Sequence, residues 1–216
     1  MFKQLFSGEL GLDSIFSLVL RVILILLAIS VHELSHGFAA YKLGDPTAKY
    51  DGRLSLNPLK HLDPLGALCM LFFGFGWAKP VSVNPNYFKN YKKDMALTAL
   101  SGPLSNVLMA FISMVLMFQI GVRFSLDILI LICDQFAILN IGLAVFNLLP
   151  IPPLDGSKIF LSLLPGKLYY EIMRFERFGF IVLAVALYLG VLDPMIYGMQ
   201  NLLYKALFFL SGGALL

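Results

Sequence analysis

The chain has 216 residues, of which 59% are hydrophobic and 13% are charged. Soluble domains average about 45–50% apolar and about 25% charged residues, so this composition argues against an ordinary soluble protein and indicates a polytopic membrane protein. The net charge of +3 is too small to indicate a nucleic-acid partner. The two cysteines, Cys69 and Cys133, form no CxxC pair, which excludes a zinc ribbon and a dithiol redox motif.

Long apolar runs predict the helices of the chain. The first predicted helix, 12–43, exceeds the roughly 20 apolar residues that a bilayer core requires, and it ends at a Gly-Asp-Pro turn. Gly52–Leu56 is predicted to be a short strand. Pro64–Phe75 is apolar but short and interrupted by glycine, so it is predicted to be a re-entrant or interfacial element. The remaining predicted helices are 95–120, 126–149, 178–192 and 195–210.

These elements predict an all-α polytopic membrane protein. We expect about four to six transmembrane helices, with a short re-entrant or β-containing element between the first two. The whole chain, 1–216, is expected to form a single integral-membrane domain. Its motif-bearing core is expected to span about 12–160 and its C-terminal helices about 178–212.

Lysine and arginine are concentrated in two predicted loops, one after the first helix and one after the third, whereas the turn between the second and third helices carries only Arg123. The positive-inside rule therefore places both basic loops in the cytoplasm and the N-terminus outside. His36, seven residues before the end of the first predicted helix, would then lie roughly 10 Å below the cytoplasmic membrane surface.

An HExxH motif, formed by His32, Glu33 and His36, lies inside the first predicted helix. Residues four apart share a helix face, so both imidazoles can bind one ion, with Glu33 beside it as a general base. Ionisable residues inside a membrane span are costly and mark functional sites by default. The motif therefore predicts a metal-dependent hydrolase, and ligands of mixed type favour zinc. A buried, non-catalytic histidine pair is the alternative.

A catalytic zinc site needs a third protein ligand. No third histidine follows at the metzincin spacing, and no glutamate occurs between His36 and Glu171. Asp155 is the favoured candidate, because it follows the third predicted helix on the cytoplasmic side, in a proline- and glycine-rich segment typical of a broken helix beside a cavity. The candidates in the first polar loop are Asp45, Asp51, His61 and Asp63.

Three segments together resemble the site-2 protease family of intramembrane zinc metalloproteases, peptidase family M50. They are HELSH at 32–36, SGPLSN at 101–106 and NLLPIPPLDG at 147–156. The last matches the NxxPxPxxDG pattern of the family at every fixed position. The segment FGFGWAKPVSVNP, 73–85, resembles the compact prokaryotic branch, and no PDZ or CBS domain is recognised. The resemblance covers about 29–159.

The resemblance implies one Zn²⁺ per chain held by His32, His36 and Asp155, with Glu33 as the general base acting on a zinc-bound water. It implies hydrolysis of peptide bonds within or near transmembrane segments of substrate proteins in the lipid bilayer. Asn147 matches the motif asparagine that is expected near the substrate carbonyl; a helix-terminal amide that binds freed backbone is the alternative. The implied location is the prokaryotic plasma (inner) membrane, with the active site toward the cytoplasm.

Other polar residues are expected to support the structure. Asn106 is expected to support helix packing or the site, with packing favoured, and Asn140 is expected to bond to other helices rather than to extend a wet cavity. His61 is predicted to lie on a surface loop, with an alternative role as a ligand or gate residue. Pro80–Pro85 alternates apolar and polar residues, which is compatible with pairing to an unwound substrate as an added strand. Two other functions remain open: a divalent-cation transporter, and a catalytically silent relative that binds membrane peptides. The sequence does not indicate an oligomeric state.

Overall fold

The computed structural model describes residues 12–61, 63, 66, 79–174 and 176–213. All regular elements within these ranges are helical, which confirms the all-α prediction. Three stretches of helix are long and apolar enough to cross a membrane. They are Ile15–Lys42 in α2 (Leu12–Lys42), Tyr91–Val122 in α5 (Tyr91–Leu116) with its extension, and α6 (Asp127–Asn147).

Helix α2 agrees with the first predicted helix to within one residue at its end. The chain turns at Gly44, whose φ of +109° is a backbone conformation that glycine adopts readily. Within the helix, the hydroxyls of Ser30 and Ser35 donate to the carbonyl oxygens four residues earlier, at 2.6 and 2.7 Å. Their hydrogen-bonding capacity is thus satisfied inside the helix, as an apolar medium requires.

Helix α5 begins earlier than predicted because Asn90 caps it. The Asn90 side chain accepts from the backbone N–H of Lys93, and the carboxylate of Asp94 accepts from the N–H of Asn90. The helix continues as a π-helical turn, η3 (Met117–Val122), before a tight turn leads into α6. Helix α6 ends two residues earlier than predicted.

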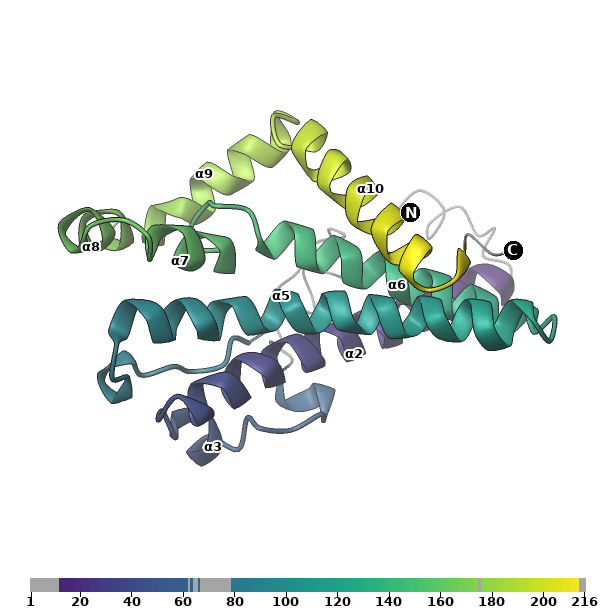
Figure 1. Ribbon diagram of the computed structural model, residues 1–216, viewed down its shortest axis with the longest axis horizontal. Coiled ribbons are helices and arrows are strands. Elements are labelled where there is room, and N and C mark those ends of the chain that lie inside the picture. The colour runs from purple at the N-terminus through teal and green to yellow at the C-terminus, as the bar shows by residue number, and fades with distance from the viewer. Residues whose placement is uncertain (1–11, 62, 64–65, 67–78, 175, 214–216) are drawn as a thin grey trace.

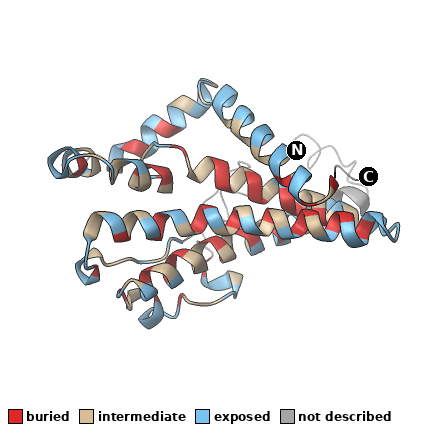
Figure 2. Cartoon of the chain, viewed as in Figure 1, coloured by how far each residue is buried: buried red, intermediate tan, exposed pale blue. Residues whose placement is uncertain are grey.

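Helix α5 packs against both α2 and α6 (Figure 1). Buried apolar residues line these contacts: one cluster joins α5 and α6 to α10 (Asp193–Leu210), and a second joins Leu24 and Ala28 of α2 to Phe136 of α6. Figure 2 shows many exposed positions along the helices. Leucine, isoleucine, valine and phenylalanine side chains are frequent among the exposed residues. An apolar exterior of this extent is what a lipid-facing surface requires.

Within the described residues, three further helices follow α6 before α10: α7 (Asp155–Leu161), α8 (Gly166–Arg174) and α9 (Glu176–Tyr188). The predicted fourth and fifth helices correspond to α9 and α10. Together, Phe178–Tyr188 and Asp193–Leu210 meet the requirements of one span, but they are bent by 86° at the break between them. By length and composition, the described residues thus contain three helices that can cross a membrane, or four if the bent pair crosses as one.

The connection between α2 and α5 contains three short helices in its described part: α3 (Thr47–Tyr50), η1 (Pro58–Lys60) and η2 (Pro85–Tyr87). The strand predicted at Gly52–Leu56 is wrong. Local turns take up backbone donors there, because the N–H of Arg53 bonds to Ala48 and that of Ser55 bonds to Arg53. The element predicted at Pro64–Phe75 lies, apart from one residue, outside the described ranges.

Gly156 allows the start of α7 to lie against the end of α6. A Cβ at this position would lie 2.3 Å from the carbonyl oxygen of Leu148 and 2.4 Å from that of Leu149. Overpacking against backbone costs about 1–3 kcal/mol. We therefore expect Gly156→Ala to lower the thermal unfolding temperature of the detergent-purified protein. Gly166→Ala is the matched control, because a Cβ at Gly166 meets nothing within 4 Å. Equal unfolding temperatures for the two variants would contradict the close contact.

Candidate metal centre

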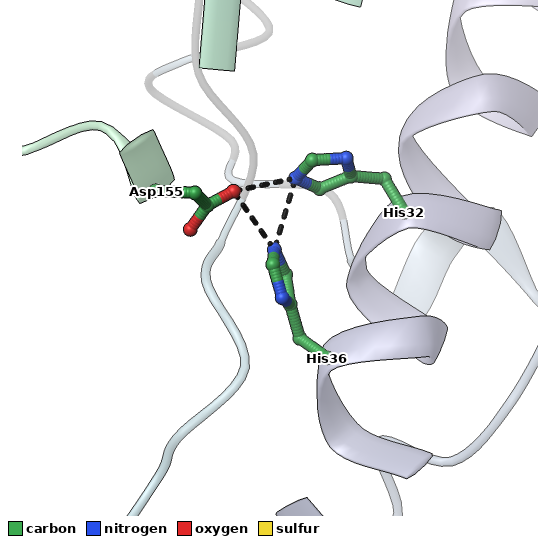
Figure 3. A group of neighbouring side chains, drawn as sticks. All are labelled: His32, His36 and Asp155. Atoms are coloured by element: carbon green, nitrogen blue, oxygen red, sulfur yellow. Dashed lines mark hydrogen bonds and ion pairs between the residues drawn. The ribbon is translucent and has the colours of Figure 1, made fainter. Parts of the chain in front are cut away.

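Three side chains converge between α2 and α7. The helical period places His32 and His36 on one face of α2, and their Nε2 atoms lie 3.0 Å apart. Asp155, the first residue of α7, directs Oδ2 at both rings, 3.2 Å from Nε2 of His32 and 3.1 Å from Nε2 of His36 (Figure 3). The structure thus brings the three predicted ligands together in a nearly equilateral triangle. The first and last of them, His32 and Asp155, are 123 positions apart in the sequence.

Each imidazole is oriented by a partner at its other nitrogen. Nδ1 of His32 lies 2.6 Å from Oδ1 of Asn106, and Nδ1 of His36 lies 2.8 Å from the carbonyl oxygen of Thr98. Both partners can only accept hydrogen bonds, so Nδ1 carries the proton in each ring. In neutral imidazoles both Nε2 atoms are then bare lone pairs directed at each other and at the Asp155 carboxylate. These three acceptor atoms can face one another only if a positive charge, a proton or a metal ion, lies between them.

The donor set fits a zinc ion. Zinc binds histidine nitrogen and carboxylate oxygen at about 2.0–2.2 Å, so tetrahedral ligand atoms lie about 3.3 Å apart. The three distances in the triangle, 3.0 to 3.2 Å, are close to this value. Two oriented histidines and one carboxylate are also a common catalytic zinc set. His32, His36 and Asp155 could therefore hold the ion that the motif predicts.

Gly102 of α5 provides the space in front of the imidazoles. A Cβ there would lie 2.4 Å from Nε2 of His36 and 2.7 Å from Cε1 of His32. The side of the centre facing α5 is thus a cradle that even a methyl group would fill. Gly102 belongs to the SGPLSN segment of the family resemblance, and its lack of a side chain leaves room for the metal centre.

Asp155 is ionised in this setting. Burial by itself would raise its pKa, but the interactions with His32 and His36 outweigh that effect and hold the pKa of this carboxyl well below its usual range. A proton on an imidazole can supply the attracting charge when no metal is bound. Either way Asp155 is a carboxylate, which is the form that a metal ion binds.

Glu33 is held by the chain between α2 and α5. Its Oε2 accepts the backbone N–H of Val81 at 2.9 Å. The segment around Val81, residues 79–84, is tied down at both ends: the N–H of Lys79 donates to the carbonyl of His61, and the N–H of Asn84 donates to Oδ2 of Asp45. We call residues 79–84 the strap. The strap gives the Glu33 carboxylate a defined orientation.

Three of the four alternative ligand candidates in the first polar loop have structural contacts instead, and the fourth, Asp51, is exposed. Asp45 is fully buried and binds Thr47 as well as the strap. His61 is also buried, with Nε2 2.7 Å from the carbonyl of Ser55, so its predicted place on a surface loop is wrong. Asp63 accepts from the N–H of Gly66. Among the described residues, only the three-residue group formed by His32, His36 and Asp155 has a metal-binding arrangement.

Asn147 is the last residue of α6 and is half-buried. Its amide donates to the carbonyl of Leu143 at 3.0 Å, within the same helix. This contact lies inside the helix, so it differs from the bond to freed backbone that was the structural alternative. The proposed contact with a substrate carbonyl stays a prediction.

Sequence reasoning missed the partners of the histidines. For Asn106, helix packing was favoured over support of the site, yet its side chain contacts His32 directly and is fully buried. Its inclusion in SGPLSN was the available signal. The Thr98 contact is made by a backbone carbonyl, which every residue carries, so no side-chain pattern could have indicated it.

Filling the cradle tests the position of the centre. We expect Gly102→Ala to lose most of the bound zinc, because the added methyl group would meet Nε2 of His36, and the imidazoles are held in place by Asn106 and Thr98. The measurement is zinc content per chain after purification. Gly198→Ala in α10 is the control, because a Cβ there meets nothing within 4 Å. Full zinc content in Gly102→Ala would place the ion elsewhere.

Comparison with known proteins identifies the family. The model of "Peptidase family M50" matches residues 124–190. A Bacillus subtilis protein named "Putative zinc metalloprotease YwhC" is 43% identical over 170 residues, which cover 76% of this chain and 78% of that protein. Proteins with the same designation, MJ0611 of Methanocaldococcus jannaschii and Rip2 of Mycolicibacterium smegmatis, are 34% and 25% identical.

The match to MJ0611 covers 59% of this chain and 62% of that protein, and the match to Rip2 covers 75% and 64%. No solved structure matches the chain. The similarity to YwhC extends over more than three quarters of both sequences, and the family model matches the region that contains the Asp155 motif. The chain is therefore a membrane metalloprotease that belongs to peptidase family M50, the site-2 protease family.

Proposed function

We propose that this metalloprotease hydrolyses peptide bonds within or near the transmembrane segments of other membrane proteins. His32, His36 and Asp155 hold one zinc ion, and Glu33 is the general base. The observation that carries the proposal is the convergence of these three ligands. Two of them lie with Glu33 on α2, a helix that is apolar enough to span a membrane. A site on such a helix can reach a bond that soluble proteases cannot.

Zinc bound there would polarise the scissile carbonyl and increase the acidity of a nearby water. The residues of the chain carry out the proton transfers. Glu33 accepts a proton from the water as the water oxygen attacks the carbonyl carbon. Glu33 then gives that proton to the leaving amine as the C–N bond breaks. The N–H of Val81 holds one carboxylate oxygen, so Glu33 keeps a single orientation through both transfers. The products are a new carboxylate and a new amine.

The substrate must present an extended backbone, because a helix hides its carbonyl groups in internal hydrogen bonds. The strap is a non-helical segment next to Glu33, which supports pairing of an unwound substrate along residues 80–85. Asn147 is proposed to contact the substrate carbonyl near the scissile bond. The lipid bilayer delivers the substrate, and the active site faces the cytoplasmic side of a prokaryotic plasma membrane.

Two other functions use the same metal centre differently. A divalent-cation transporter would use His32, His36 and Asp155 as a transit site and would not need Glu33 as a base. A catalytically silent relative would bind membrane peptides without cleaving them. The Glu33 carboxylate, positioned beside the ligands by a backbone hydrogen bond, favours the protease over both.

Glu33→Gln separates these functions. We expect it to retain about one zinc per chain but to lose cleavage of a model single-span substrate by at least about 10²-fold, because an amide cannot take up the proton. The measurements are zinc content and cleavage in detergent or liposomes. Asp155→Ala is the comparison and should lose zinc as well. Wild-type cleavage by Glu33→Gln would contradict the assigned base, and metal flux into liposomes without cleavage by the wild type would support transport.

Val81→Pro tests the hold on Glu33. Proline has no N–H, so this variant loses the donor to Oε2, whereas Val81→Ala keeps it. A hydrogen bond to a charged group contributes about 1.5–3 kcal/mol. We expect kcat to fall roughly tenfold or more in Val81→Pro at unchanged zinc content, with little effect in Val81→Ala. A deletion of residues 81–83 should abolish cleavage without loss of zinc. Unchanged cleavage in Val81→Pro would remove the strap from the mechanism.

A further inference from the structure

A chain of buried hydrogen bonds connects the backbone of α6 to His32. We propose that Asn140 of α6 is a positioning residue that fixes, through Asn106 of α5, the tautomer of His32 that can bind a metal ion. This inference rests on the proposed metal centre. It assigns α6, which contributes no ligand, a direct part in preparing that centre.

The chain has three short links. Nδ2 of Asn140 donates to the carbonyl oxygen of Phe136 at 2.8 Å, Nδ2 of Asn106 donates to Oδ1 of Asn140 at 2.8 Å, and Oδ1 of Asn106 lies 2.6 Å from Nδ1 of His32. Both asparagines have 0% of their surface exposed. The links therefore join α6, α5 and α2 in a region where water does not compete for the hydrogen bonds.

Each link has only one possible direction. The Phe136 carbonyl can only accept, so Asn140 must turn its NH₂ group toward it and its Oδ1 toward Asn106. That oxygen also only accepts, so Asn106 must turn its own NH₂ group toward Asn140 and its Oδ1 toward His32. His32 must then donate from Nδ1. The Nε2 lone pair is left free toward His36 and Asp155.

Without this chain, Asn106 could adopt the opposite orientation. An amide has nearly the same shape after a half turn, so only its partners select one orientation. A turned Asn106 would offer an N–H to Nδ1 of His32 and would favour the tautomer with its proton on Nε2. That proton would occupy the position of the metal. The other acceptor near Nδ2 of Asn106, the Ala28 carbonyl, is 3.4 Å away, so Asn140 is the stronger determinant.

The same two helices offer a hydrogen bond that serves as a control. The hydroxyl of Ser113 in α5 donates to the carbonyl of Cys133 in α6 at 2.8 Å, and it is also buried. It joins the helices at another level, and among the described residues it makes no hydrogen bond to either histidine. Loss of this bond should affect helix packing alone, whereas loss of Asn140 should affect packing and the metal centre.

The experiment measures zinc affinity by competition with a chelator, together with the thermal unfolding of the metal-free protein, for full-length protein in detergent. We expect Asn140→Leu to weaken zinc binding about 10- to 100-fold, the usual effect of losing an outer partner of a metal-binding histidine. Ser113→Ala should leave zinc affinity unchanged. If Asn140→Leu does not fold, Asn140→Ser replaces it, since a hydroxyl has no fixed direction and should weaken zinc binding in the same sense.

A second background distinguishes orientation from packing. In the Asn106→Asp background, the side chain facing His32 has two acceptor oxygens and no N–H, so it cannot favour the wrong tautomer. Adding Asn140→Leu there should change zinc affinity less than about twofold. Wild-type affinity in Asn140→Leu alone, or an equal loss in both backgrounds, would overturn the proposal. Absence of zinc binding in the wild type would instead overturn the proposed metal centre.

Discussion

The structure depends on holding three hydrogen-bond acceptors face to face inside an apolar helix bundle. Nε2 of His32, Nε2 of His36 and Oδ2 of Asp155 lie 3.0 to 3.2 Å apart, and none of them carries a proton toward the others when both imidazoles are neutral. Such a group is unfavourable without a cation at its centre. The surrounding protein must therefore fix each atom in place before the cation binds, and Asn106 and Thr98 do so for the two imidazoles.

The elements that supply and orient the metal ligands lie far apart in the sequence. Helix α2 supplies two ligands and the base, and α7 supplies the third ligand. Helix α5 supplies none, but it orients both imidazoles through Asn106 and Thr98 and leaves room for them at Gly102. The strap orients Glu33. The central position of α5 between α2 and α6 is what allows one helix to support both histidines.

The sequence predicted the parts that follow from periodicity and motif. The spacing of His32 and His36 determines their common face on any helix, and α2 matches its predicted bounds almost completely. Contacts between helices depend on crossing angles and on which rotamers fit, so the Asn106–His32 contact and the burial of His61 were not predictable from spacing. The strand expected at Gly52–Leu56 failed because residue preferences cannot supply the neighbouring strand that a ladder requires.

The two histidine ligands are fixed in position more firmly than Asp155 is. Both histidines lie on a 31-residue helix and are tied to α5, whereas Asp155 lies on a seven-residue helix that begins after a run of prolines. A ligand that binds only the folded protein stabilises it in proportion to RT ln(1 + [L]/Kd). Since the two imidazoles are already positioned by α5, that stabilisation falls mainly on the attachment of α7 to the bundle. We therefore expect α7 to be the element whose position depends most on zinc.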